Sequence, residues 1–279
     1  MPILHVNQAA GTIPLEAECL TPDQTLGKSA DEIARLPVWH GNRATTLGEF
    51  FDIDPAGDDL VLHGDLRRVK GIGQRMTRGR LIVHGSVGMH AGAEMTGGEL
   101  HIHGDAGDWL GAEMHGGRIW VHGNAGDLAG AAYRGARRGM RGGEILIDGD
   151  AGQETGITMR RGLIAVGGRL GDFSGGGMIA GTLLAFGRVG TRLGAGMKRG
   201  TLVLFAETPA LLPSFAAAGV FEPLFLELYL RHLRSLGFAA ARIARTPMRR
   251  WCGDRLSLGK GEILTPAEPP AAASATATP

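Results

Sequence analysis

The feature that most constrains this chain is a repeat of 19 residues that runs through its middle. Three successive copies read Met76-Thr-Arg-Gly-Arg-Leu-Ile-Val-His, Met95-Thr-Gly-Gly-Glu-Leu-His-Ile-His and Met114-His-Gly-Gly-Arg-Ile-Trp-Val-His. The register continues at Met140, Met159, Met178 and Met197, with a single longer step of 26 residues before Met140. A fixed period near 20 predicts a solenoid, in which each repeat is one unit stacked on the last.

Glycine indicates which kind of solenoid this is. The chain contains 47 glycines, and they interrupt every repeat too often for a helix to form. Short strands separated by glycine turns instead predict an all-β fold, a right-handed parallel β-helix. Three glycine columns, starting at Gly73, Gly79 and Gly88, should mark corners that need a positive φ or leave no room for a Cβ. The predicted strand cores indicate eight coils and lie at Leu60, Leu81, Leu100, Ile119, Ile145, Ile164, Leu183 and Leu202.

Alternation along each predicted strand separates the inside from the outside. Leu81 and Val83 represent two uniformly apolar positions that should point inward, and the repeated methionines should form a flexible ladder that fills the remaining corner. The outward position between these two inward strand positions is also apolar, which indicates that something covers it. This outward stripe consists of Val61, Ile82, His101, Trp120, Leu146, Ala165, Leu184 and Val203.

The flanks of the repeat differ from it. Residues 1–55 carry no repeat, contain a Ser29/Glu32 capping box, and are expected to cap the first coil of a β-helix that spans residues 56–206. Residues 207–265 should form a C-terminal helix and an extended tail, and residues 266–279 a disordered tail. The helix is predicted over 221–237, and because its apolar residues surround most of its circumference, we expect one side on the C-terminal coils and another on a partner.

Composition excludes several classes of function. A net charge of +1 gives no general attraction to nucleic acid or to an anionic membrane. The two cysteines, Cys19 and Cys252, are too few for a disulfide framework or a cysteine-rich metal site. The sequence shows neither a signal peptide nor a membrane span. A cytoplasmic location is therefore expected.

Two repeated sets of side chains could be mistaken for catalytic or metal sites. His63, His84, His103 and His122 should stack about 4.8 Å apart on the outside, which presents parallel rings rather than the convergent ligands that a metal needs. Carboxylates in the turns, such as Asp105 and Asp108, could suggest a carbohydrate-active enzyme. They recur from coil to coil, as do Asn124/Asp127 and Asp172, so turn formation is the favoured interpretation. No catalytic or metal-binding residue is predicted.

The repeat is interrupted at one place. The longer step falls within residues 131–140 and adds Arg134, Arg137, Arg138 and a tyrosine. Insertions in solenoids map to surface loops, often on the binding face. A solvated turn with no binding role is the alternative for this loop.

The glycine repeats resemble a domain shared by the glutamate synthase large subunit and the C subunit of formylmethanofuran dehydrogenase. The flanks separate the two families, because the resemblance to the C subunit extends to Pro14-Leu-Glu-Ala-Glu, to Leu47-Gly-Glu-Phe-Phe-Asp-Ile, to Leu228-Tyr-Leu-Arg-His-Leu and to residues 253–264. The Arg-rich, Lys-poor composition favours the C subunit of the bacterial formyltransferase/hydrolase complex.

This resemblance implies a non-catalytic scaffold subunit in one-carbon metabolism. Such a complex moves a formyl group from formyl-tetrahydromethanopterin to a methanofuran-type carrier and hydrolyses formylmethanofuran to formate. The implied partners are an amidohydrolase-like catalytic subunit with zinc, a formyltransferase subunit and a dehydrogenase-B-like subunit, while this chain alone binds no cofactor. A molybdenum or tungsten formylmethanofuran dehydrogenase is the alternative within the family. The alternatives outside it are a stand-alone carbohydrate-active β-helix enzyme and a glutamate synthase-like domain.

Two sets of site residues follow as expectations. The three arginines of the insertion should contact the acidic glutamyl tail of the carrier, because guanidinium groups pair with carboxylates in bidentate fashion. The partner interface should include Ile82, His101, Trp120, Leu224, Phe225 and Leu228.

Overall fold

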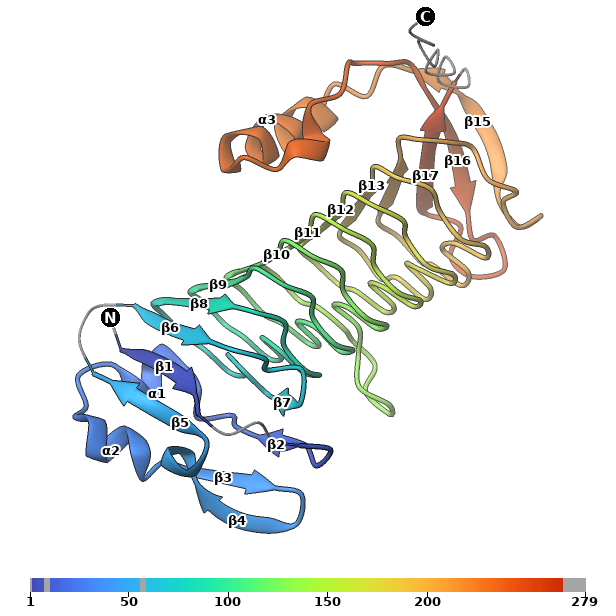
Figure 1. Cartoon of the computed structure of the whole chain (residues 1–279). Helices are drawn as coiled ribbons and strands as arrows, with labels where there is room; N and C mark the ends of the chain where they lie inside the picture. Colours follow the sequence, from blue (N-terminus) through green and yellow to red (C-terminus); the bar gives the residue numbers. More distant parts are fainter. Residues whose placement is uncertain (1, 8–10, 56–58, 268–279) are drawn as a thin grey trace, which may run out of the picture.

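The computed structural model describes residues 2–7, 11–55 and 59–267 of the chain. These residues are mostly β, with a few short helices, as the all-β prediction required. Figure 1 shows the repeats as successive coils stacked along one long axis. Within the described residues, the main sheet has 13 strands in the order β15-β16-β17-β14-β13-β12-β11-β10-β9-β8-β6-β1-β5.

The repeats supply the parallel centre of this sheet. Leu81 lies opposite Leu60 on one side and Leu100 on the other, and all eight predicted strand cores align in this way. A second line of parallel bridges joins Leu66 to Val87 and continues to Val189. The repeat strands are β6 (Leu60–His63), β8 (Arg80–His84), β9 (Glu99–Ile102), β10 (Arg118–Val121), β11 (Glu144–Ile147), β12 (Leu163–Val166), β13 (Thr182–Ala185) and β14 (Thr201–Leu204).

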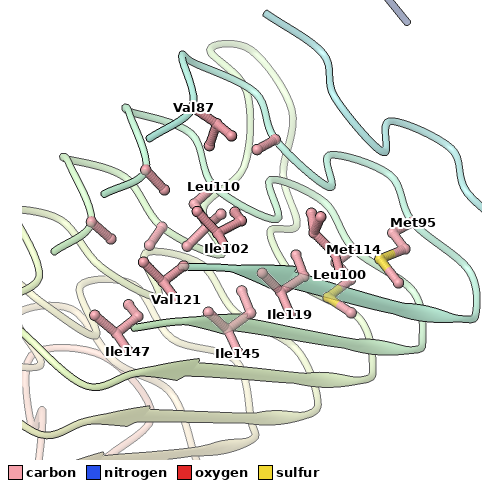
Figure 2. Packing of buried hydrophobic residues seen from close by; sticks show 14 of the residues in the cluster. Val87, Met95, Leu100, Ile102, Leu110, Met114, Ile119, Val121, Ile145 and Ile147 are labelled. Atoms are coloured by element: carbon pink, nitrogen blue, oxygen red, sulfur yellow. The ribbon is translucent and has the colours of Figure 1, made fainter. Parts of the chain in front are cut away.

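The core fills the space inside the coils. Figure 2 shows Leu100, Ile102, Ile119 and Val121 pointing from the strands toward apolar side chains of the other sides. The predicted methionine ladder is confirmed, since each of its members has 0% exposure: Met76, Met95, Met114, Met140, Met159, Met178 and Met197. Methionine suits this corner because its unbranched thioether adapts to irregular gaps between coils.

Glycine fits the corners for both predicted reasons. The column that starts at Gly79 adopts a positive φ in every coil, from +80° there to +102° at Gly181. Gly88 represents the other reason, because a Cβ at this position would lie 2.5 Å from the Val69 carbonyl oxygen. Backbone atoms cannot rotate away, so stacking at this corner requires glycine.

The N-terminal segment extends the sheet beyond the first repeat. Strand β1 pairs in parallel with β6 and antiparallel with β5, so β5 forms the edge. The Ser29/Glu32 capping box is confirmed at the start of α2. The elements here are β1 (Ile3–Val6), β2 (Leu15–Glu16), α1 (Pro22–Thr25), α2 (Ala30–Ala34), β3 (Pro37–His40), β4 (Arg43–Thr46), η1 (Leu47–Glu49), β5 (Phe51–Asp54) and β7 (Val69–Lys70). Strands β4, β3, β2 and β7 form a separate small sheet.

The C-terminal segment folds back onto the coils. Strand β17 (Gly261–Pro266) pairs in parallel with β14, and β16 (Met248–Gly253) lies between β17 and β15 (Ala216–Phe221). Helix α3 (Leu226–Leu236) and η2 (Ala239–Ala241) lie between β15 and β16 in the chain. Figure 1 shows α3 extending back over the outside of the coils.

Two predictions about this segment need correction. The helix begins at Leu226 rather than Phe221, because Phe221 pairs with Met248 in a strand. The proline that follows also disfavours helical backbone geometry in the residue before it. Gly237 does end the helix, at a φ of +92°. The prediction of a disordered tail from residue 266 was wrong for Pro266, which ends β17, and for Ala267, whose backbone N–H donates to the Pro247 carbonyl oxygen. The remainder of that prediction, from residue 268 onward, lies outside the described residues.

Candidate functional site on the outer face and the inserted loop

The outward apolar stripe is divided into a covered and an uncovered half. In the last four coils Leu146, Ala165, Leu184 and Val203 have 0% exposure, and they pack with the apolar face of α3. The expectation that something covers the stripe is therefore confirmed for these coils, and the cover is α3 of the same chain rather than a partner. The covering helix is distant in the sequence, and the stripe itself carries no signal of which segment will pack on it.

The uncovered half begins at Val61, which is itself buried with 6% exposure, and its other members are the three predicted interface residues of the stripe. Ile82, His101 and Trp120 are only half-buried. Trp120 lies where the two halves meet, with its ring 6.4 Å from Phe238 and 6.0 Å from His101. Its indole Nε1 is buried and has no hydrogen-bond partner among the described residues, which leaves a donor unsatisfied at the boundary of the open surface.

A column of alternating charges runs beside the stripe. Arg80 lies 3.8 Å from Asp59 and 3.4 Å from Glu99, and Arg118 lies 3.0 Å from both Glu99 and Glu144. His232 of α3 continues the column at 2.7 Å from Glu144. The column therefore ties the uncovered coils electrostatically to α3. Sequence reasoning missed it, although the residue before each predicted strand core reads Asp59, Arg80, Glu99, Arg118, Glu144 in order.

The histidine column runs along the other side of the stripe. The predicted stacking is confirmed, with ring centroids 4.7–5.0 Å apart from His63 to His122. His5 of β1 adds a fifth ring at 4.8 Å, and the Asp148 carboxylate lies 2.7 Å from His122 at the other end. Burial, followed by the neighbouring histidines, lowers the pKa of His63 and of His103, so these rings favour the neutral state.

Helix α3 presents a second apolar surface. Leu226, Leu230 and Leu233 lie beneath it against the coils. The other three predicted interface residues point away, with exposed fractions of 68% for Leu224, 38% for Phe225 and 67% for Leu228. One side of the helix thus packs on the coils as predicted, and the opposite side is free to meet another molecule.

The inserted loop is anchored by its tyrosine. The Tyr133 ring stacks 5.0 Å from Trp109, its hydroxyl lies 3.1 Å from His90 Nδ1, and its backbone N–H donates to Glu113. Burial, followed by the Glu94 and Glu113 carboxylates, raises the pKa of Tyr133 to about 12. Sequence reasoning did not find this cluster, although His90 and Trp109 occupy the same repeat position, 19 residues apart.

The three arginines of the loop are exposed. Among the described residues, none of them forms an ion pair with a carboxylate. Arg134 lines a cleft of about 490 Å³ together with Trp109, Tyr133 and Thr158, whereas Arg137 and Arg138 do not line it. The contacts of Tyr133 hold the backbone of the loop in place, while the guanidinium groups of the three arginines are available to bind a ligand.

The turn carboxylates and amides serve the stacking of the coils. Asp105 Oδ1 accepts the backbone N–H of Asn124, and Asn124 Oδ1 accepts that of Asp150. Asp108, Asp127 and Asp172 accept a backbone N–H of the following coil at 2.7–2.9 Å. Each side chain therefore satisfies an otherwise open donor, in agreement with the interpretation as turn residues.

No His, Cys, Asp or Glu cluster suited to a metal ion is found in residues 2–7, 11–55 and 59–267. The same described residues contain no helix with the length and hydropathy needed to cross a membrane.

Comparisons with known proteins identify relatives. The GXGXG motif family matches residues 99–215. The C subunit of the tungsten-containing formylmethanofuran dehydrogenase 2 of Methanothermobacter wolfeii is 41% identical over 87 residues, which are 29% of this chain and 32% of that protein. The C subunit of the molybdenum-containing formylmethanofuran dehydrogenase 1 of Methanosarcina barkeri is 40% identical over 94 residues, or 32% and 31%. The matched segment thus spans about a third of these curated relatives.

A solved structure matches nearly the whole chain. It is the crystal structure of the formyltransferase/hydrolase complex (FhcABCD) from Methylorubrum extorquens in complex with methylofuran. One chain of that complex superposes with a TM-score of 0.87 and 35% identity, and the match covers 95% of this chain and 100% of the other.

Proposed function

Because the chain belongs to the family of formylmethanofuran dehydrogenase C subunits, we propose that it is a non-catalytic scaffold subunit of a formyltransferase/hydrolase complex. That complex would transfer the formyl group from formyl-tetrahydromethanopterin to a methanofuran-type carrier and hydrolyse formylmethanofuran to formate. The observation that carries the proposal is the match along 95% of this chain to one chain of such a complex.

The scaffold role follows from how the repeat uses its side chains. We interpret the stack as a right-handed parallel β-helix, whose boundaries would be residues 1–55 for the cap, 56–206 for the coils and 207–265 for the C-terminal part. Inward positions fill the core, and the turn carboxylates and amides accept backbone N–H groups. The remaining side chains form a long rigid surface, which is better suited to positioning other subunits than to catalysing a reaction.

The proposal includes the composition of the complex. The partners would be an amidohydrolase-like subunit with zinc, a formyltransferase subunit and a dehydrogenase-B-like subunit, in the cytoplasm. Ile82, His101 and Trp120 on the coils and Leu224, Phe225 and Leu228 around the start of α3 would contact them. Their exposed or half-buried apolar surface supports this assignment.

The experiment is a tagged purification of this chain from its native host. We expect the three partner subunits in stoichiometric amounts, formate release from a formyl-tetrahydromethanopterin donor by the eluate, and none by the isolated chain. Recovery of a monomer without partners would contradict the scaffold proposal. A monomer that cleaved an acidic polysaccharide unaided would instead support the carbohydrate-active alternative.

A redox complex is the second candidate within the family. The similarity to subunits of tungsten-containing and molybdenum-containing dehydrogenases favours it. Metal analysis of the purified complex separates the two candidates, because only a dehydrogenase requires tungsten or molybdenum. The longer match to the formyltransferase/hydrolase chain, which covers 95% of this chain, favours the hydrolytic complex.

We further propose that Arg134, Arg137 and Arg138 hold the acidic tail of the carrier. Three exposed guanidinium groups on an anchored loop can each form bidentate bonds with a carboxylate. Changing all three to alanine should raise the apparent KM for the carrier about tenfold, equivalent to about 1.4 kcal/mol, with assembly unchanged.

The matched control changes the same number of exposed cations elsewhere on the coils, in Arg188→Ala, Lys198→Ala and Arg199→Ala. This variant has the same net charge as the loop variant and should keep the parental KM. An equal KM for the loop variant and the parent would rule out the contact.

A further inference from the structure

Strand β15 ends the main sheet with an open edge. It pairs with β16 alone and is the last strand in the order. Within the described residues, no other segment pairs with its outer side. The exposed stretch Ala217–Val220 lies within this strand, so its outward N–H and C=O groups face solvent.

The composition of β15 does not protect this edge. Natural sheets guard their edge strands with charges, proline or bulges. At the opposite end of the sheet, β5 carries Asp52 and Asp54, whereas β15 reads Ala-Ala-Ala-Gly-Val-Phe without charge or proline. The register shifts between Ala217 and Gly219, where Gly219 adopts a φ of +114°, and regular pairing with β16 continues at Val220 and Phe221. This edge is therefore able to accept a further strand.

The neighbouring strand determines what kind of strand fits. Arg250 lies opposite Gly219 and Arg249 opposite Val220, and residues paired in this way point to the same face. A Cβ at Gly219 would have nothing within 4 Å, so a side chain on an added strand can reach across Gly219 to Arg250. The Arg250 guanidinium lies over the Phe221 ring at 5.6 Å, and its nearest carboxylate is Glu262 at 4.0 Å. Arg249 forms no ion pair among the described residues.

We propose that β15 accepts an extended, acidic segment of a partner chain as an additional strand of the sheet. Main-chain hydrogen bonds would hold the segment, and its carboxylates would pair with Arg249 and Arg250. A second copy of β15 fits less well, because it would bring the arginines of both copies toward one edge. The inference rests on the proposed function only in assuming that partner chains exist.

Hydrogen exchange in the native complex and in the isolated full-length chain tests the pairing. Open edge amides exchange quickly, and pairing protects them. We expect residues 216–221 to exchange at least about tenfold more slowly in the complex, with a smaller change in β16, which is already paired on both sides. Equal exchange of β15 in the two states would overturn the proposal, even where the complex itself is recovered intact.

A photo-crosslinker at Val220 identifies the neighbour. Attachment to an acidic stretch of another subunit supports the proposal, whereas attachment to a second copy of this chain, or to a basic or helical segment, overturns it. Arg249→Glu with Arg250→Glu, or Ala218→Glu alone, should return β15 exchange to the rate of the isolated chain. The controls Arg255→Glu and Ala218→Ser should keep the protection, because neither places a repelling charge at the edge.

Discussion

At the scale of single residues, the histidine column makes stability depend on pH. The pKa values of His63 and His103 lie below their usual value in the folded chain. The unfolded chain therefore binds protons more readily, so the free energy of unfolding falls as the pH drops below about 6.5 toward the folded pKa values. Well above that pH both states are neutral at His63 and His103, and these two residues contribute no pH dependence.

Denaturant unfolding at pH 8 and pH 5.5 measures this effect. His103→Asn removes the ring that lies between His84 and His122, and it should reduce the loss of stability on acidification. His115→Asn changes an exposed histidine outside the column and should keep the parental loss. The same loss in all three proteins would show that the column does not respond to pH.

At the scale of elements, α3 has one structural and one free face. Leu233 is fully buried against the coils, so Leu233→Ala should lower the free energy of unfolding of the isolated chain by about 2–5 kcal/mol. Leu228→Ala, on the exposed side of the same helix, should change it by less than about 0.5 kcal/mol. In the purified complex the proposed interface predicts the reverse sensitivity, since Leu228→Ala should reduce the recovery of partner subunits. Normal recovery with Leu228→Ala would remove this residue from the interface.

The elements also show what the sequence could predict. The strand cores and the methionine ladder were predictable because every coil repeats the same local pattern, so seven copies determine one register. The packing of the C-terminal helix on the coils was also predicted, but the individual contacts of α3 with Leu146 and Leu184 and the stacking of His5 on His63 were not. These contacts join segments that do not repeat, and no spacing within the repeat specifies them. The loop anchored by Tyr133 was predictable only as an insertion, because its direction depends on Trp109 and His90.

At the scale of the whole molecule, the coils form a nearly one-dimensional object in which each repeat contacts its neighbours. Deleting residues 86–104 removes one full period and joins Gly85 to Asp105, which occupies the position of Ser86 in the next repeat. We expect this variant to fold with one strand fewer, because Leu81 then pairs with Ile119 and the methionine ladder stays continuous. The cost is local, since Glu99 is lost and Arg80 comes to lie beside Arg118. These side chains are 24–52% exposed, and ion pairs at the protein surface contribute about 1 kcal/mol or less.

Deleting residues 86–94 is the matched control, because it leaves half a coil that cannot complete the circuit between neighbouring strands. Circular dichroism and thermal unfolding compare the two variants. We expect a parental spectrum and one cooperative transition for the full-period deletion, and loss of both for the half-period deletion. If the full-period deletion also failed to fold, stability would depend on contacts beyond nearest neighbours. The cap and α3 would then have to stabilise all the coils together rather than only the coils that they contact. If the full-period variant folded, stability would instead depend mainly on the interface between each coil and the next.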